Sequence, residues 1–262
     1  MKKLYFGLGT KGGIGKTNTM LNLCQVAAYR GLDFEYLELD NSNNTSETLN
    51  NSKVFKDRMS SCVVTQAQEE LFKAVWKALK ENKVVFVDVG GGTETNQLIQ
   101  LLNEEFAHHD IGFVLPFQNS NKQMKNLEKT YKSIGKPENI YLVKNQLKNE
   151  DDPFRFFEGD INLGIESFRK KINPVNTVFK IFDSDIQQLP ENTNQCMLDL
   201  CELAIQYNRE EAEKVFLKKA KDVNDFNVLM QKYTVAVGCL KEIKRLSDEF
   251  AELFENEGKG DE

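Results

Sequence analysis

The sequence lacks the features that mark membrane, secreted and metal-cluster proteins. No apolar run approaches the roughly 18 residues that a membrane-spanning helix needs, and Lys11 interrupts the short apolar stretch that follows the basic start, so a secretion signal is not expected. The five cysteines are scattered without a CxxC pair, and there are only two histidines. A disulfide framework and a zinc or iron–sulfur centre are therefore not expected either. We expect a cytoplasmic protein that does not bind membranes.

Neither sign of charge dominates the chain. It holds 34 basic and 40 acidic residues, a net charge of −6. Most of the excess lies in residues 245–262, which hold seven acidic and two basic residues, and the rest is close to neutral. This balance excludes a protein coated with DNA over its whole surface but leaves room for a local basic face.

Strand-length apolar runs alternate with helical patterns in the first 190 residues. The runs are Leu4–Leu8, Phe34–Leu39, Val84–Val89, Ile111–Leu115, Ile140–Val143 and Val175–Phe182. Helical patterns near residues 17–30, 66–81, 95–107 and 121–134 lie between them. Such alternation predicts a doubly wound, mainly parallel α/β sheet with helices on both faces.

The rest of the chain is predicted to be helical. Apolar or small residues recur there at spacings of three and four, from Phe226 to Phe254, which is a heptad seam. The seam either packs on its own domain or protrudes to meet a second subunit or a partner. We therefore divide the chain into an α/β domain, residues 1–190, and a C-terminal helical region, residues 191–262.

A glycine-rich segment follows the first predicted strand and opens the first predicted helix. It reads Gly9-Thr10-Lys11-Gly12-Gly13-Ile14-Gly15-Lys16-Thr17. Glycines let backbone N–H groups converge on an oxyanion, and the helix N-terminus adds partial positive charge. Lys16 would reach the β- and γ-phosphates of a nucleotide, and the Thr17 hydroxyl would coordinate Mg²⁺. The segment predicts a phosphate-binding loop.

In this KGGxGKT loop, Thr10 occupies the position at which a phosphate loop usually has its first glycine. The loop resembles the deviant phosphate loop of the ParA/MinD family of ATPases. The resemblance implies the P-loop NTPase fold, with ATP and Mg²⁺ as ligands. It also implies a homodimer that sandwiches ATP, in which Lys11 touches the nucleotide of the other subunit. Asn18 stands where the family usually has Thr or Ser, and its amide can donate to an α-phosphate. The implied nucleotide contacts are Lys11, Gly12, Gly13, Ile14, Gly15, Lys16, Thr17 and Asn18.

The resemblance also includes three residues that lie at the ends of predicted strands or directly after them. Asp40 is similar to the residue that orients or activates the attacking water, so Lys11, Lys16 and Asp40 form the implied catalytic set. Asp88 ends the apolar run Val84–Val87 in the Walker B manner and would hold Mg²⁺ opposite Thr17. Asn145 is expected to recognise the adenine edge. Plain alternatives stay open: Asp40 as a turn cap, Asp88 as the end of any buried strand, and Asn145 as the start of a turn.

The resemblance covers about residues 3–190 and implies a ParA-like ATPase. Such a protein partitions a plasmid or chromosome together with a ParB-like DNA-binding adaptor. One alternative is a MinD-like positioning ATPase that acts on a membrane or a protein assembly, although the acidic end, Glu255–Glu262, would be repelled by anionic lipid. Another is a metabolic ATP-dependent ligase of the same fold, against which Lys11 counts.

A lysine stripe is the candidate DNA surface. Lysines at spacings of three and four share one face of the predicted helix near 121–134 or lie just past its end: Lys122, Lys125, Lys129, Lys132 and Lys136. A solvated helix face is the ordinary explanation. The alternative is a stripe that tracks phosphates without reading sequence. A weaker second candidate is Lys214, Lys218, Lys219 and Lys221.

Overall fold

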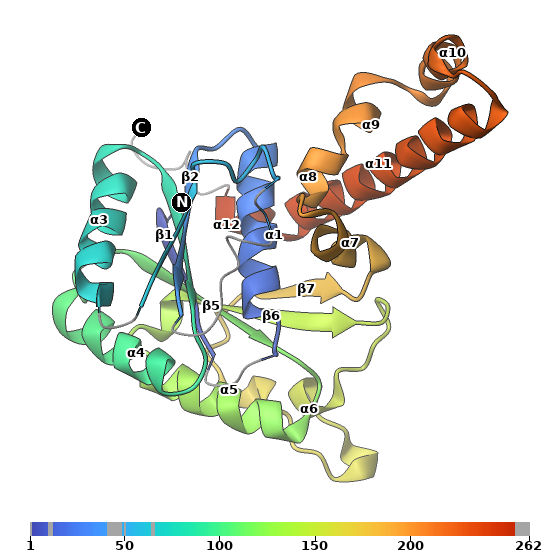
Figure 1. Cartoon of the computed structure of the whole chain (residues 1–262). Coiled ribbons are helices and arrows are strands. Elements are labelled where there is room, and N and C mark those ends of the chain that lie inside the picture. The colour runs from blue at the N-terminus through green and yellow to red at the C-terminus, as the bar shows by residue number, and fades with distance from the viewer. Residues whose placement is uncertain (1, 10–12, 41–48, 50, 64–65, 255–262) are drawn as a thin grey trace, which may run out of the picture.

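The structure, a computed structural model, describes residues 2–9, 13–40, 49, 51–63 and 66–254. Its centre is a seven-stranded sheet in the order β3-β2-β4-β1-β5-β6-β7 (Figure 1). The strands are β1 (Leu4–Gly7), β2 (Phe34–Leu39), β3 (Met59–Cys62), β4 (Val84–Val89), β5 (Ile111–Phe117), β6 (Ile140–Leu147) and β7 (Val178–Phe182). Every neighbouring pair is parallel. The predicted doubly wound parallel sheet is confirmed, and all six predicted strands are present.

The edge strand β3 was not predicted. Its sequence, MSSC, has no apolar run, and its side chains are half-buried or exposed. The strand forms because its backbone pairs with β2, from Tyr36 opposite Met59 to Leu39 opposite Cys62. Backbone pairing at a sheet edge does not require an apolar sequence, so hydrophobic periodicity gave no signal.

Helices cover both faces of the sheet. On one face α3 (Ala67–Lys80), α4 (Thr93–Glu105) and α5 (Asn121–Ser133) pack against strand residues such as Phe6 and Val87. On the other face α1 (Lys16–Tyr29) and the C-terminal helices pack against Tyr5, Tyr36 and Phe86. The inner strands are thus buried on both sides, which explains their nearly unbroken apolar sequences.

Short helices connect the later strands and form the C-terminal region. They are η2 (Pro137–Asn139), α6 (Arg155–Glu158), η3 (Ile161–Leu163), η4 (Arg169–Lys171), α7 (Asp185–Thr193), α8 (Met197–Leu200), α9 (Glu202–Gln206), α10 (Arg209–Lys219) and α12 (Ala251–Phe254). The longest helix, α11 (Val223–Glu249), runs back to the sheet. Within the described ranges, no helix is long and apolar enough to cross a membrane.

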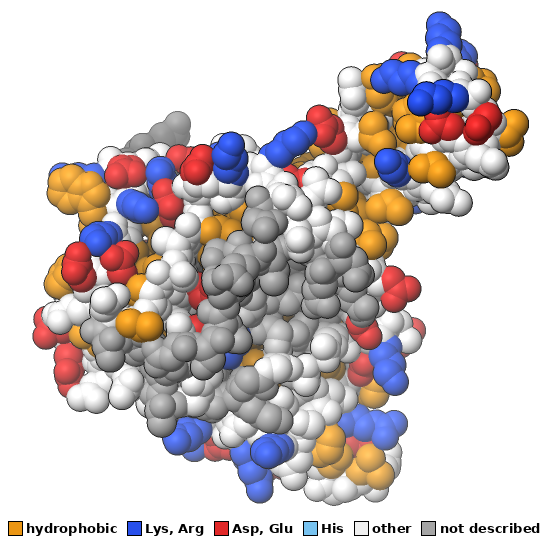
Figure 2. Space-filling view, in the orientation of Figure 1, with side chains coloured by type: hydrophobic (Ala, Val, Ile, Leu, Met, Phe, Trp, Pro, Cys, Tyr) orange, Lys and Arg blue, Asp and Glu red, His pale blue; other side chains and the backbone are white. Residues whose placement is uncertain are grey.

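The two halves of α11 have different surroundings. Toward its C-terminal end, Ile243 and Leu246 are fully buried in the core beneath α1, and the Arg30 guanidinium donates to the Ser247 carbonyl over 2.7 Å. The N-terminal half packs with α10 in a separate small cluster around Phe216 and Tyr233, which projects from the body (Figure 1). Figure 2 shows that hydrophobic and basic side chains both lie on the surface of this projection. One end of the heptad seam therefore packs on the domain and the other end protrudes.

Replacing Leu246 by Ala should lower the free energy of unfolding by about 2–5 kcal/mol, because it leaves a cavity in a fully buried site. The matched control is Leu217→Ala on α10, where the leucine is 65% exposed and the expected change is within about 0.5 kcal/mol. Denaturant unfolding of both variants checks this. Equal losses would mean that the projecting cluster carries as much of the folding energy as the central core.

Candidate nucleotide site

The candidate site lies where β1 ends. Strand β1 sits between β4 and β5, so the chain builds the sheet outward from β1 in both directions. Ligands of open α/β sheets bind outside the carboxyl ends of the strands at such a switch point. The predicted phosphate loop leaves β1 here and enters α1, which begins at Lys16.

The described part of the phosphate loop has the backbone that only glycine adopts easily. Gly13 has φ 74° and Gly15 has φ 84°, both left-handed. A Cβ atom on Gly15 would lie 1.7 Å from the side-chain nitrogen of Asn145. Lys11 and Gly12, for which a catalytic role and nucleotide contacts are predicted, lie outside the described residues.

Side chains from three other elements hold the carbonyl groups of this loop. Gln118 Nε2 donates to the Gly13 carbonyl over 3.1 Å, and Asn145 Nδ2 donates to the Ile14 carbonyl over 2.9 Å. The Thr95 hydroxyl lies between two carbonyl oxygens, 2.9 Å from that of Gly90 and 3.1 Å from that of Gly9. Bonds to the carbonyl side favour a loop whose N–H side faces a ligand. Thr95 and Gln118 were not predicted, and no local sequence signal identifies them.

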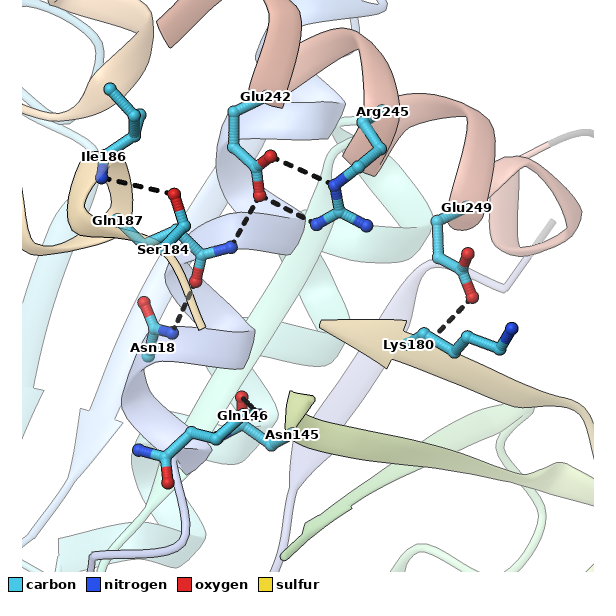
Figure 3. Close-up of polar contacts among 10 residues, drawn as sticks. All are labelled: Asn18, Asn145, Gln146, Lys180, Ser184, Ile186, Gln187, Glu242, Arg245 and Glu249. Carbon is cyan, nitrogen blue, oxygen red and sulfur yellow. Dashed lines mark hydrogen bonds and ion pairs between the residues drawn. The ribbon is translucent and has the colours of Figure 1, made fainter. Parts of the chain in front are cut away.

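Asn145 lies beneath the loop. Its side chain is buried, and its Oδ1 accepts from the backbone N–H of Gln146 over 3.0 Å (Figure 3). The Asn145 amide thus forms hydrogen bonds within the protein that hold the loop in place. Its recognition of adenine stays a prediction. Gln146, the next residue, is exposed with φ 60°, and its Oε1 accepts from Gln118 over 2.7 Å.

Thr17 and Asp88, the predicted magnesium ligands, are in contact. The Thr17 hydroxyl donates to Asp88 Oδ2 over 2.6 Å, and the Tyr36 hydroxyl donates to the same oxygen over 3.1 Å. The other carboxylate oxygen, Oδ1, is buried and has no hydrogen-bond partner among the described residues. Strand register adds a second buried acid, because Glu38 on β2 lies opposite Asp88 on β4.

This surrounding makes the Asp88 carboxylate costly to ionise. Burial raises its pKa to about 6, and the charge of Glu38 adds to the rise. The hydrogen bond from Thr17, the charge of Lys16 and the hydrogen bond from Tyr36 oppose it. A divalent cation would remove that cost. Carboxylate and hydroxyl oxygens suit Mg²⁺, so Thr17 and the buried carboxylate of Asp88 fit the ion predicted for them.

The other predicted residues lie around this centre. Lys16 is buried in the first turn of α1, and Asp40 is half-buried directly after β2. Asn18 Nδ2 donates to Gln187 Oε1 of α7 over 3.2 Å (Figure 3). The structure thus brings Lys16, Thr17 and Asp88 together at the end of β1, with Asn18 in the same turn of α1.

A parallel sheet with a glycine loop entering a helix at its switch point defines a nucleotide-binding protein of the P-loop class. The sequence model of the CobQ/CobB/MinD/ParA nucleotide binding domain matches residues 6–196, and the chain belongs to that family. The predicted family relationship is confirmed. No curated protein matches the sequence.

Two solved structures agree with this fold. The MinD cell division protein of Aquifex aeolicus has a TM-score of 0.51 at 14% identity, covering 94% of this chain and 98% of its own. The MinC:MinD complex of that organism also has 0.51, at 11% identity over 94% and 96%. A further match, the pNOB8 ParA bound to nonspecific DNA, has 0.49, at 9% identity over 98% and 100%. At 14% and 11% identity, the likeness to the two MinD structures concerns the fold alone.

Replacing Asp88 by Asn should stabilise the protein in the absence of nucleotide and Mg²⁺. The folded-state pKa of about 6 lies above the ordinary 3.8, so ionising Asp88 costs stability as the pH rises between these values, and the full cost persists above them. The gain should therefore be about 1–3 kcal/mol at pH 7.5 and smaller at pH 4.5. Denaturant unfolding at both pH values measures it, with the exposed Asp151→Asn as control. A gain independent of pH would exclude the buried charge as its cause.

Proposed function

We propose that the protein is a ParA-like ATPase, a switch that dimerises around ATP and is reset by hydrolysis. The observation that carries the proposal is the convergence of Lys16, Thr17 and Asp88 at the mouth of the glycine loop. Membership of the nucleotide-binding family supports it independently.

Each residue has a distinct part in this proposal. Lys16 neutralises charge on the β- and γ-phosphates, and the loop from Lys11 to Asn18 cradles them. Thr17 and Asp88 hold the Mg²⁺ ion, which would offset the charge of the phosphates during transfer. Asp40 orients the attacking water. Lys11 reaches the nucleotide of the second subunit, so that ATP holds the dimer together.

The dimer would act in partition of a plasmid or chromosome, with a ParB-like adaptor that binds the cargo and stimulates hydrolysis. This part of the proposal rests on the resemblance of the KGGxGKT loop to that of ParA proteins. A basic face on α5 supports contact with DNA. Lys122, Lys125 and Lys129 are exposed there.

Three substitutions separate binding, dimerisation and turnover. Lys16→Ala should abolish ATP binding, because it removes the charge that balances the phosphates. Lys11→Ala should keep ATP binding but lose the ATP-dependent dimer, because that charge is supplied to the other subunit. Asp40→Ala should bind ATP and dimerise but hydrolyse it more than about tenfold more slowly. Calorimetry, light scattering with a slowly hydrolysed ATP analogue, and phosphate release measure the three steps.

The contrary outcomes are equally distinct. Unchanged ATP affinity in Lys16→Ala would exclude this loop as the nucleotide-binding site. An ATP-dependent dimer that persists in Lys11→Ala would show that Lys11 is not needed to bind the nucleotide of the other subunit. Normal turnover in Asp40→Ala would move the water-orienting role elsewhere, for example to Glu38.

Contacts within the protein reduce the number of lysines in the proposed DNA-binding stripe. Lys132 pairs with Glu128 over 2.6 Å, and Lys136 donates to the His109 carbonyl over 3.1 Å. In the neighbouring basic segment Arg169–Lys171, Lys171 pairs with Glu166 over 3.1 Å, and its charge also acts on Glu128. The stripe is therefore reduced to Lys122, Lys125 and Lys129, which are exposed on α5.

Reversing Lys125 and Lys129 to Glu should weaken ATP-dependent DNA binding and reduce the salt slope by about two, because two phosphate contacts are lost. ATP affinity should not change. The matched control reverses Lys218 and Lys219 on α10, both exposed. Fluorescence anisotropy of a DNA duplex at several salt concentrations measures the slope, and liposome cosedimentation tests the membrane alternative. A larger effect of the control pair would place the DNA on the projecting helices.

A further inference from the structure

A chain of polar side chains connects the phosphate-loop helix to α11 (Figure 3). Asn18 Nδ2 donates to Gln187 Oε1 over 3.2 Å, and Gln187 Nε2 donates to Glu242 Oε1 over 2.7 Å. The chain ends at Arg245, which donates to both oxygens of Glu242 over 2.7 and 3.0 Å. It joins three helices, α1, α7 and α11, whose residues are far apart in sequence.

The charged end of this chain fixes the direction of every hydrogen bond in it. An ionised carboxylate only accepts, so Gln187 must present its NH₂ group to Glu242. The carbonyl oxygen of Gln187 then faces Asn18, and Asn18 must present its NH₂ group in turn. The orientation of the Asn18 amide is therefore decided by an acid on another helix.

Several contacts hold Glu242 in the ionised form that this argument needs. Burial opposes its ionisation, but the hydrogen bonds from Arg245 and Gln187 outweigh it and keep the pKa of Glu242 below its ordinary value. The Arg245 guanidinium lies over the Phe182 ring at 4.7 Å, which fixes it at the end of β7. The side chains of Glu242 and Arg245 are 13% and 29% exposed, so water competes for their bonds less than it does at the surface.

We propose that Gln187 and Glu242 are positioning residues for bound nucleotide and act through the amide of Asn18. The inference rests on the proposed nucleotide-binding function. Asn18 lies two residues after Lys16, on the first turn of α1. One hydrogen of its NH₂ group is given to Gln187, and the chain holds the second in a fixed direction for a phosphate oxygen. A Thr or Ser hydroxyl at this position rotates to suit its acceptor; an amide needs such a support.

A double-mutant cycle separates positioning from simple packing. Gln187→Met keeps the size of the side chain but cannot orient Asn18, and should weaken binding of ADP with Mg²⁺ about fivefold. In a chain that carries Asn18→Thr, the same change should alter ADP affinity less than about twofold, since the hydroxyl needs no support. Glu242→Gln should weaken binding by an intermediate factor, about two- to threefold, because an amide does not impose one direction. The matched control is Gln100→Met, which removes an exposed Gln–Glu hydrogen bond on α4 and should leave the affinity unchanged.

Calorimetry with ADP and Mg²⁺ gives the affinities, and thermal unfolding without ADP gives the structural effect of each change. An equal loss of affinity with Asn18 intact and with Asn18→Thr, or no loss in either background, would overturn the inference and leave the chain as a clamp between helices. The Lys16→Ala variant distinguishes failure of the proposed nucleotide-binding function from failure of the positioning role of Gln187. If ADP binding does not need Lys16, the proposed function fails and the inference with it. If binding needs Lys16 but ignores Gln187, the inference alone fails.

Discussion

The buried carboxylate of Asp88 is the constraint on which the candidate site depends. Strand pairing places it at the switch point of the sheet, opposite Gly7 on one side and Glu38 on the other. Burial of a charge is costly unless partners compensate it. Thr17 and Tyr36 satisfy one oxygen, and the other has no partner among the described residues. The hydrophobic core offsets the cost of this arrangement, and a cation beside Thr17 would relieve it.

The shape of the phosphate loop depends in turn on the ends of the neighbouring strands. Gln118 directly follows β5, Asn145 directly follows Lys144, where the regular pairing of β6 is interrupted, and Thr95 lies in the first turn of α4. Gln118 and Asn145 each donate to a carbonyl group of the loop, and the Thr95 hydroxyl lies between the Gly9 and Gly90 carbonyl oxygens. The left-handed glycines allow the loop to turn, and these tethers select one of the conformations that glycine permits. The rigid sheet thus determines where backbone donors would meet a phosphate.

The sequence predicted the parts of the molecule whose signals are local. Buried parallel strands are contiguous apolar runs, and the phosphate loop is contiguous too, so both could be located without coordinates. The long-range side-chain contacts could not, because Gln118 and Gln187 meet partners 105 and 169 residues away, and the Gly9 carbonyl that Thr95 faces is 86 residues away. The edge strand β3 was not predicted, because a strand that forms through backbone pairing alone has no hydrophobic pattern in its sequence. The heptad pattern of α11 is continuous, so it could not indicate that one half packs on the sheet and the other on α10.

Helix α11 carries charged side chains directly beside the apolar residues that it packs into the core. Its residues Ile243 and Leu246 belong to the core, yet Glu242 and Arg245 on the same turn are charged and mostly buried. Replacing a buried ion pair by apolar residues often costs nothing in stability, so the fold alone does not require this pair. The carboxylate does what no apolar side chain can do: it gives the amides of Gln187 and Asn18 a single direction. The same helix continues into the projecting cluster around Tyr233, so the element that orients Asn18 is also the one that carries the protruding surface.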